Sequence, residues 1–557
     1  MTAALVSATL VAVATRPWGT AGLAWVALVP AFHAVARPPG RSALRAGVIT
    51  YVAAVGFAAV AYEATLGLAL VAYPLVVGVA ALPFGAAGAA AAWVSGRSRA
   101  LPAWAALPIF WCATEVLVRQ EWLLGRWALP LSAIGYTQSG TAAVHLARFS
   151  SVTAVSLAVL LVNGLIAALV AALWDRPAGA STHPSAPPLS LAAPRLGASA
   201  RLAPARARPA LVGLAIVGAL IAAAWRTAPA PPAAQPGPLH DPSDQATGPT
   251  DPAVALLAVL QPDLPPAARG AARLDAAVAA EVAAGLVALS TAGATPGGGL
   301  ERQLQVWPEA IWPAWLPRGA AQAAAAQPAG APAQPAAVAA QRAAVAAQLA
   351  AVAGQLAGAP PAILGGAGRD AATGSASNAA FLWSGTTLTH VFDKRHTVPI
   401  AEDGLVRSGA PVVVLGGGIR VAPLICYDVA FPATVRLAAR GGAELLAVLT
   451  DDTFAAGSDV PRQHLRVARL RAVESGLWLA FASNGGPSAL IDPAGRIAAA
   501  TEPGEAALLR ATARLGTGST PYLAYGDWVG VLAWLLVAVA ASLAGLEGGG
   551  YRRPRAT

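Results

Sequence analysis

Residues 420–432 read RVAPLICYDVAFP, an apolar run that ends in a cysteine, a tyrosine and an aspartate. A short apolar run without polar alternation is typical of a strand that is buried on both faces of a sheet. A side chain at the end of such a strand is held rigidly by the turn that follows. Cys426 is therefore a candidate nucleophile, although a free cysteine taken alone is more often an inert core residue.

Similar apolar runs recur from about residue 253 onward, and helical segments separate several of them. The segment RQHLRVARLRAVES (462–475), for example, has apolar residues near helical spacing. This alternation predicts an α/β domain with two sheets or one large sheet. The other runs lie at 253–262, 361–367, 378–383, 443–451, 477–484 and 488–493.

The composition of the chain is that of a membrane protein. Of its 557 residues 56% are hydrophobic and 11% are charged, and the mean hydropathy is +0.58. Soluble domains carry roughly 25% charged residues, so a large share of this chain is expected in lipid. Apolar runs of sufficient length predict eight membrane spans. These spans lie near 3–15, 20–36, 46–62, 66–94, 101–118, 151–173, 210–225 and 527–546.

Arginine clusters occupy alternate loops between the predicted spans. The net charge is +10, but the arginines border apolar segments and do not alternate with aromatic residues on a soluble face. The charge therefore indicates membrane topology and not a nucleic-acid partner. The positive-inside rule makes the arginine-rich side cytoplasmic and puts residues 227–525 outside the cytoplasm. The clusters follow the second, fourth, sixth and eighth spans.

These patterns divide the chain into four parts. Residues 1–226 are expected to form a helical membrane domain with seven spans, and residues 227–252, rich in Pro, Ala and Gly, a linker. Residues 253–520 form the α/β domain, and residues 521–557 the last span with a basic cytoplasmic tail. An imperfect seven-residue repeat at 336–356 predicts a helix with one packing face.

Three fragments of the α/β domain place a reactive side chain at the edge of an apolar run. They are VWPEAIWP around Glu309, FDKRHTVPIAE around Lys394 and LICYDVAFP around Cys426. Lys394 is the only lysine among 37 basic residues, which hints at a task that arginine, with its fixed charge and planar fork, cannot perform. Together the three side chains supply a base, an electrostatic stabiliser and a nucleophile for acyl transfer. Singly, Glu309 could cap a helix and Lys394 could be a chance surface lysine.

The remaining histidines and the second cysteine suggest no further chemistry. His396 and His464 belong to no cluster with metal-ligand spacing, so they are interpreted as structural or rim residues and no metal is expected. Cys112 lies in an apolar span and is interpreted as a small core residue. Two cysteines in such different contexts do not predict a disulfide.

Motifs along most of the chain, taken in order, resemble a known family, the apolipoprotein N-acyltransferases, which form the membrane-bound branch of the nitrilase or carbon-nitrogen hydrolase superfamily. The resemblance implies a multi-pass α-helical membrane domain of about eight spans and an extracytoplasmic nitrilase-like αββα sandwich. The motifs are WPE (307–309), FDK (392–394) with VP (398–399), ICYD (425–428), DDTF with PRQHLRVARLRAVESG (451–476), SNGGPSALIDPAGRI (483–497), TPYLAYGDW (520–528) and, in the membrane part, EWLLGRWALPLSAIGYTQ (121–138).

The resemblance implies a role for each member of the trio. Glu309 would be the general base, Lys394 would stabilise the oxyanion and Cys426 would be acylated. The acyl donor would be a phospholipid of the bilayer, and the acceptor the amino group of a diacylglyceryl-modified apolipoprotein. The protein would lie in the bacterial cytoplasmic (inner) membrane with its catalytic domain on the periplasmic side, and no cofactor is implied.

Three further residues match the family's site. Glu402 corresponds to a second acidic residue that helps to orient the trio, and Tyr427 and Asp428 follow the nucleophile where the family usually has Tyr and Glu. The departures from the family pattern are expected to affect the loops that receive lipid more than the trio. They are Ile400 and Ala401 in place of Phe and Gly, Asp428 in place of Glu, and residues 450–455 in place of Ser-Asn-Asp-x-Trp-Phe.

Two alternatives to acyl transfer remain. The chain could be a membrane-anchored hydrolase of a small amide or nitrile, with the spans acting only as an anchor. It could also be a catalytically degenerate relative that binds lipoprotein without acylating it. The altered loops favour the second alternative, and the intact trio disfavours it.

Overall fold

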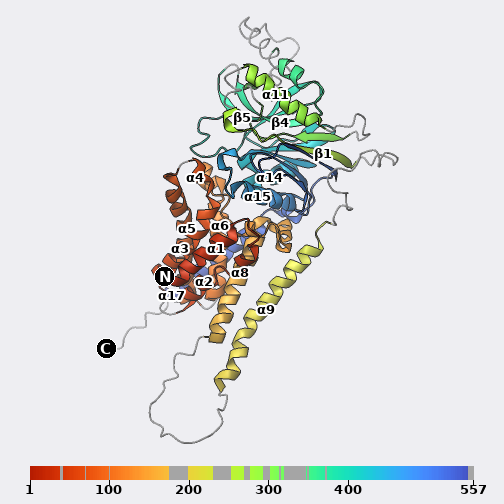
Figure 1. Ribbon diagram of the computed structural model, residues 1–557. Helices are drawn as coiled ribbons and strands as arrows, with labels where there is room; N and C mark the ends of the chain where they lie inside the picture. Colours follow the sequence, from red (N-terminus) through yellow and green to blue (C-terminus); the bar gives the residue numbers. More distant parts are fainter. Residues whose placement is uncertain are drawn as a thin grey trace, which may run out of the picture.

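The structure is a computed structural model in which a helical bundle carries an α/β domain at one end (Figure 1). It describes residues 1–37, 42–68, 70–98, 101–174, 198–229, 253–268, 276–292, 302–312, 315–318, 347, 350–370 and 373–549. The predicted linker at 227–252 lies almost wholly outside these residues.

The bundle is formed by the described residues up to Arg226 together with a helix near the end of the chain. Among the described residues, five helices are long and apolar enough to cross a membrane, and three of the predicted spans are shorter apolar helices. Each predicted span coincides with helix, and the number that cross the membrane stays a prediction. The elements are α1 (Thr2–Thr15), η1 (Ala21–Trp25), α2 (Val29–Ala36), α3 (Ala43–Ala61), α4 (Ala64–Leu68), α5 (Ala72–Arg97), α6 (Ala103–Val118), α8 (Ala147–Trp174), α9 (Ala198–Arg226) and α17 (Trp528–Gly549).

Glycines allow the bundle helices to approach each other closely. A Cβ at Gly56 of α3 would lie 2.1 Å from the carbonyl oxygen of Ala8 in α1, and one at Gly164 of α8 would lie 2.1 Å from that of Trp104 in α6. In lipid, helices associate through such close packing because no hydrophobic effect drives them together. Helix α9 runs along α8 at the side of the bundle (Figure 1).

The segment between α6 and α8 packs against the α/β domain. It contains four short helices, and its side chains Tyr136 and Val144 share a core with Leu465 of the α/β domain. Sequence analysis assigned no structure to this segment, because its helices are too short to show a period. They are α7 (Glu121–Leu124), η2 (Gly125–Trp127), η3 (Ile134–Gln138) and η4 (Ala142–Leu146).

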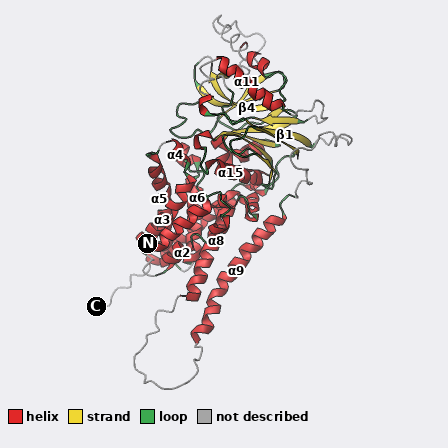
Figure 2. Cartoon of the chain, viewed as in Figure 1, coloured by secondary structure: helices red, strands yellow, loops and turns green. Residues whose placement is uncertain are grey.

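The α/β domain contains two sheets, which appear as the yellow strands of Figure 2. The first has the order β13-β1-β2-β4-β5-β6, with β3 paired to β4, and the second has the order β12-β11-β10-β9-β8-β7. The strands of the first sheet are β1 (Val254–Gln261), β2 (Gln303–Val306), β3 (Trp315–Arg318), β4 (Ala362–Asp370), β5 (Ala376–Trp383), β6 (Leu388–Asp393) and β13 (Ala507–Arg514). Those of the second are β7 (Val414–Gly416), β8 (Ile419–Ile425), β9 (Leu445–Asp451), β10 (Trp478–Asn484), β11 (Ala489–Ile491) and β12 (Ile497–Ala500).

The two sheets pack face to face, and helices cover their outer faces. Val306 and Ile363 of the first sheet share a core with Val421 and Leu445 of the second. Helix α11 (Ala276–Thr291) covers the first sheet, whereas α14 (Pro432–Arg440) and α15 (Val460–Ser475) cover the second. The αββα sandwich is therefore confirmed, with two sheets and not one. Strands β8, β9 and β10 lie in the middle of the second sheet because they are apolar runs that can be buried on both faces.

One of the two helices predicted in the α/β domain lies wholly within the described residues, and the other lies only partly within them. Helix α15 contains the predicted segment 462–475, and Gly476 ends it in the left-handed conformation (φ +68°) that favours glycine. Of the repeat at 336–356, Val352 is buried against the outer core of the first sheet. Val338 and Val345 lie outside the described residues.

A buried ion pair joins the α/β domain to the bundle. Arg471 and Glu474 of α15 pair with each other, and both are fully buried. The Glu474 carboxylate also accepts hydrogen bonds from the Ser151 hydroxyl (2.9 Å) and the Val152 N–H (2.7 Å) of α8, and the Arg471 guanidinium donates to Tyr136 (2.7 Å). The relative position of the two parts is therefore fixed by directional bonds.

Replacing Glu474 by alanine is expected to destabilise this junction, because Arg471 would stay buried without its carboxylate. Breaking one side of a buried ion pair costs about 3–5 kcal/mol. Thermal unfolding of the full chain in detergent measures the effect as a lower Tm. Arg420→Ala is the control, since that side chain is 51% exposed and 3.6 Å from Glu444, and an exposed pair contributes less than about 1 kcal/mol. Equal Tm values for the two variants would contradict the prediction.

Candidate active site

The trio predicted from sequence lies at strand ends of the two facing sheets. Glu309 follows β2 and Lys394 follows β6 in the first sheet, whereas Cys426 follows β8 in the second. Glu309 is 5% and Lys394 1% exposed, and Cys426 is partly exposed. The sandwich thus presents a buried charged pair from one sheet to a more accessible thiol from the other.

A glycine in the neighbouring strand allows Glu309 to sit where it does. A Cβ at Gly365 of β4 would lie 2.2 Å from the Pro308 carbonyl oxygen and 2.6 Å from the Glu309 Cα. The Gly365 N–H donates to the same Pro308 carbonyl (3.2 Å), and Ala310 then takes a left-handed conformation (φ +49°). The turn that aims Glu309 is therefore fixed by backbone contact with β4.

The ammonium of Lys394 is held between two carboxylates. Its Nζ donates to Glu309 Oε1 (2.9 Å) and to Glu402 Oε1 (2.8 Å). Glu402 is held in turn by the Val398 N–H, which donates to its Oε2 (2.7 Å). The structure thus brings together the general base, the cation and the second acidic residue that the resemblance implied.

Asn378 is a member of this cluster that sequence analysis missed. Its side-chain amide donates to Glu309 Oε1 and to Glu402 Oε1, the latter at 3.3 Å. The backbone carbonyl oxygen of Asn378 accepts from the backbone N–H of Lys394 (2.7 Å). The available signal was its position as the polar residue that opens the apolar run NAAFLW, and no role was assigned to it.

Cys426 lies in a strained turn that Asp428 stabilises. The φ angle of Cys426 is +48°, in the left-handed region that is unfavourable for residues other than glycine. Asp428 accepts a hydrogen bond from the Ile425 N–H (3.0 Å), immediately before the nucleophile, and is 0% exposed. Asp428 was expected among the lipid-receiving loops, and this placement was wrong because Asp428 is a buried residue that supports the turn.

The environment of the trio disfavours charge on both the Cys426 thiol and the Glu309 carboxyl. Burial raises the pKa of Cys426 well above its ordinary value, the charge of Glu309 adds to this, and Lys394 opposes it. Burial also raises the pKa of Glu309 against the effect of Lys394. Burial would lower the pKa of Lys394, but the negative charges of Cys426, Glu309 and Glu402 raise it well above its usual range. Lys394 is therefore a permanent cation here.

Two histidines flank the nucleophile turn inside the protein. His396 lies 2.8 Å from Asp428 Oδ1 through Nδ1 and 2.7 Å from Glu121 Oε1 through Nε2. His464 lies 3.1 Å from Asp452 Oδ1 and 3.2 Å from the carbonyl oxygen of Cys426. His396 is buried and His464 is partly buried, and the hydrogen bonds of both agree with the structural role predicted as one of the two interpretations. Glu121 opens the EWLLG motif, but sequence analysis gave it no role.

The segment 450–455, which departs from the family pattern, lines the other side of the trio. The Asp451 N–H donates to Glu309 Oε2 (3.0 Å), so this segment holds the base directly. Asp452 is buried and accepts from the Ser483 hydroxyl (2.8 Å) as well as pairing with His464. Phe454 is 41% exposed and faces outward.

Exposed apolar side chains lie on the segments that neighbour the site, and we call this part of the surface the entrance. Trp122 and Trp127 of the segment after α6, and Ile400 of the loop after Lys394, are strongly exposed. Tyr427 is partly buried, and its ring meets Phe431 edge-on at 5.1 Å. An exposed aromatic residue has an apolar body and a polar edge that suit a membrane interface.

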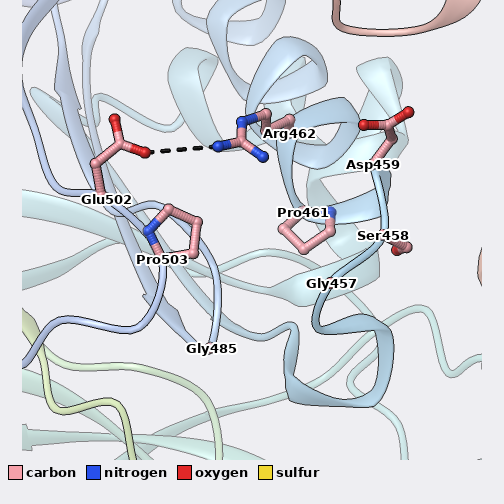
Figure 3. Close-up of a pocket in the computed structure, with 8 residues that line it drawn as sticks. All are labelled: Gly457, Ser458, Asp459, Pro461, Arg462, Gly485, Glu502 and Pro503. Atoms are coloured by element: carbon pink, nitrogen blue, oxygen red, sulfur yellow. Dashed lines mark ion pairs between the residues drawn. The ribbon is translucent and has the colours of Figure 1, made fainter.

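A polar hollow of about 300 Å³ opens beside the first turn of α15 (Figure 3). Arg462 and Glu502 face each other across it, with an Nη2 to Oε2 distance of 3.5 Å. None of the trio lines this hollow, so it is separate from the candidate active site. Among the described residues, no group of three or more His, Cys, Asp or Glu side chains is arranged to hold a metal ion.

Two family models match the chain in tandem. One, described as carbon-nitrogen hydrolase, matches residues 257–520, so the α/β domain is a nitrilase-type domain. The other, described as the apolipoprotein N-acyltransferase N-terminal domain, matches residues 7–165. The chain belongs to the apolipoprotein N-acyltransferase family, within the nitrilase superfamily.

Curated relatives match shorter stretches of the chain. The apolipoprotein N-acyltransferase of Shewanella oneidensis is 35% identical over 156 residues, 24% of this chain and 30% of the relative. That of Pseudomonas aeruginosa is 40% identical over 112 residues, 20% of this chain and 22% of the relative. The matched stretch thus spans less than a third of either relative. An amidase of the nitrilase superfamily from Nesterenkonia is similar in structure at 22% identity and a TM-score of 0.35, over 50% of this chain and 97% of its own.

Gly365→Ala is expected to displace Glu309, because the added Cβ would overlap its backbone. If Glu309 accepts the thiol proton, its displacement should slow alkylation of Cys426 by iodoacetamide about tenfold or more, since small displacements of catalytic groups have effects of this size. Mass spectrometry of the modified chain gives the rate. Gly285→Ala in α11 is the control, because its Cβ meets no atom within 4 Å. A Gly365→Ala rate equal to that of the control would show that the close contact does not position Glu309.

Proposed function

We propose that this protein transfers a fatty acyl chain from a membrane phospholipid to the N-terminal amino group of the diacylglyceryl-cysteine of an apolipoprotein. The observation that carries the proposal is the buried Glu309–Lys394 pair, whose charges act on the thiol of Cys426. The names of the relatives support the same reaction. The exposed aromatic residues at the entrance support a substrate that arrives from the membrane.

The first half of the reaction forms a thioester. Glu309 accepts the thiol proton while the sulfur of Cys426 attacks the ester carbonyl carbon of the phospholipid. The ammonium of Lys394 stabilises the oxyanion that develops on the carbonyl oxygen. The ester C–O bond then breaks, and the lysophospholipid leaves with the proton that Glu309 held.

The second half transfers the acyl group to the acceptor. The amino nitrogen of the diacylglyceryl-cysteine attacks the thioester carbon, and the C–S bond breaks as the amide forms. The proton lost by the amine passes through Glu309 to the sulfur, which restores the thiol. Two substrates that react in turn at one covalent site give ping-pong kinetics.

The proposed location is a bacterial cytoplasmic membrane with the α/β domain on the periplasmic side. The α/β domain contacts the bundle at the end where Arg16 follows α1 and Glu121 follows α6. Helix α2, which Arg37 follows, and helix α5, which ends at Arg97, run to the opposite end (Figure 1). The positive-inside rule makes that opposite end cytoplasmic.

Incubation of the full chain with vesicles of a phospholipid of one defined acyl composition is expected to add that acyl group to Cys426. Intact-mass and peptide mass spectrometry detect the adduct, and neutral hydroxylamine removes it because it is a thioester. Cys426→Ala should carry no adduct, whereas Cys112→Ala should carry the wild-type amount. An adduct formed only with a small amide or nitrile would favour the hydrolase alternative, and no adduct at all the degenerate one. Undiminished N-acylation by Cys426→Ser would refute the mechanism.

The rate of thioester formation is expected to rise with pH as Glu309 ionises, since only its carboxylate can accept the thiol proton. Burial raises the pKa of Glu309. The increase in rate should therefore occur at a higher pH than it would with an ordinary carboxyl. Removal of a general base lowers rates by about 10²–10⁴-fold, and Glu309→Gln should lose both this factor and the ascending limb. Initial rates across pH measure both effects. Glu444→Gln, far from the site, is the control, and an unchanged limb in Glu309→Gln would exclude Glu309 as the base.

A further inference from the structure

The segment 121–127 of the membrane domain contacts the catalytic loop 395–403 at two charged points. Glu121 Oε1 lies 2.7 Å from His396 Nε2, and Arg126 Nη1 lies 2.8 Å from Asp403 Oδ1. We call residues 121–127 the docking segment. The second contact joins residues 277 positions apart in the sequence, so neither part could make these bonds alone.

Apolar packing joins the same two regions. An apolar cluster contains Leu124 of the docking segment and Ala128 and Leu131, which follow that segment. The same cluster contains Tyr427 of the nucleophile turn and Phe431, which follows the turn. The ring of His396 stacks on Phe431 with a centroid distance of 3.8 Å and an interplanar angle of 10°. The docking segment therefore touches the turn of Cys426 as well as the loop of Lys394.

His396 links a carboxylate of the membrane domain to a carboxylate of the nucleophile turn. Its Nδ1 lies 2.8 Å from Asp428 Oδ1, opposite the Nε2 contact with Glu121, and the side chain is 6% exposed. Two carboxylates this close to the ring favour the positively charged imidazolium, which pairs with both of them. Burial would lower the pKa of His396, but the hydrogen bonds and charges of Asp428 and Glu121 raise it.

Asp428 passes this connection on to the nucleophile. Its Oδ2 accepts from the Ile425 N–H (3.0 Å), and its Oδ1 accepts from the His396 N–H (2.8 Å). The next residue, Cys426, has the unfavourable φ of +48°. A strained conformation persists only where the surrounding contacts determine it. Each contact from Glu121 through His396 and Asp428 therefore helps to hold the thiol in place.

We infer that His396 is a positioning residue for Cys426 and that Glu121 is its partner in the membrane domain. The nucleophile is fully assembled only while the docking segment lies on loop 395–403. The active site is thus completed across the boundary between the two domains. The inference shares with the proposed function the assignment of Cys426 as nucleophile, but it concerns the thiol itself and is tested without a lipid substrate.

The test is the rate at which iodoacetamide alkylates Cys426 in the full chain in detergent, in a Cys112→Ala background. Glu121→Gln is expected to slow alkylation about tenfold, because the turn loses part of its support. His396→Asn can replace only the Nδ1 contact with Asp428, and it should be slowed equally. The double variant should be no slower than either single variant, since both remove one connection.

Asp459→Asn is the matched control for a change at the domain boundary. It removes an ion pair with Arg16 (2.9 Å) across the same boundary, and the side chain of Asp459 makes no capping hydrogen bond to α15. Its alkylation rate is expected to equal that of the wild type. Thermal unfolding of every variant shows whether a slow rate reflects loss of fold, and only variants with the wild-type Tm are compared.

The pH dependence separates positioning from simple packing. The rate of the wild type divided by that of Glu121→Gln should fall to one as the pH rises above the His396 pKa, because the neutral ring loses one donor. The groups that face this ring are Glu121 from α7 and Asp428 from η6, and Arg395 and Arg407 act on Glu121. A ratio that does not change with pH would overturn the inference.

Two further outcomes would also overturn it, namely a wild-type alkylation rate for Glu121→Gln or for His396→Asn. Failure of the proposed function is a different result. In that case the wild-type thiol would be alkylated and the variants slowed, but no acyl adduct would form from phospholipid. If acyl transfer succeeds but all variants are alkylated at the same rate, only the positioning role of His396 is contradicted.

Discussion

The bond between the Lys394 ammonium and the Glu309 carboxylate is the constraint on which the site depends. Both groups are almost fully buried, and a buried charge without its partner is strongly destabilising. The pair therefore needs further hydrogen bonds to satisfy it, and Asn378, Glu402 and the Asp451 backbone supply them. Because these partners come from both sheets, the site has its geometry only when the two sheets are packed together. The charges that act on the Cys426 thiol are therefore held in determined positions.

Cys426 is not held by an ion pair, because its raised pKa keeps the thiol uncharged. Its backbone is strained, and the strain is maintained by hydrogen bonds to the carboxylate of Asp428. Asp428 is one methylene shorter than the glutamate usual in the family, yet it reaches both the Ile425 N–H and His396. The residue that seemed a departure at the lipid entrance is therefore part of the interior framework. The departures at Ile400 and Phe454 do lie on exposed positions, where they can alter the entrance without disturbing the trio.

Sequence predicted the features that depend on local pattern and missed those that depend on how distant segments meet. Unbroken apolar runs identified β8, β9 and β10, because a strand buried on both faces has no polar side. The single lysine in an arginine-rich chain marked Lys394, since burial between two carboxylates suits a compact ammonium. Asn378 was missed because its role arises from the antiparallel pairing of β5 with β6, which brings it beside Lys394. Glu121 was missed because its partner lies in another domain.

The junction between the domains bears on whether the helices serve only as an anchor. Helices that serve only as an anchor need no directional contacts with the domain that they hold at the membrane. Here Arg466 donates to the carbonyl oxygens of Thr15 and Arg16, and Glu474 binds the start of α8. Buried polar bonds of this kind are made only at a defined docking geometry, because misalignment would leave charges unpaired in the interior. The contacts therefore fix where the loops of the α/β domain lie relative to the bundle. A bundle held in this way is part of the framework that positions these loops, and more than a tether for them.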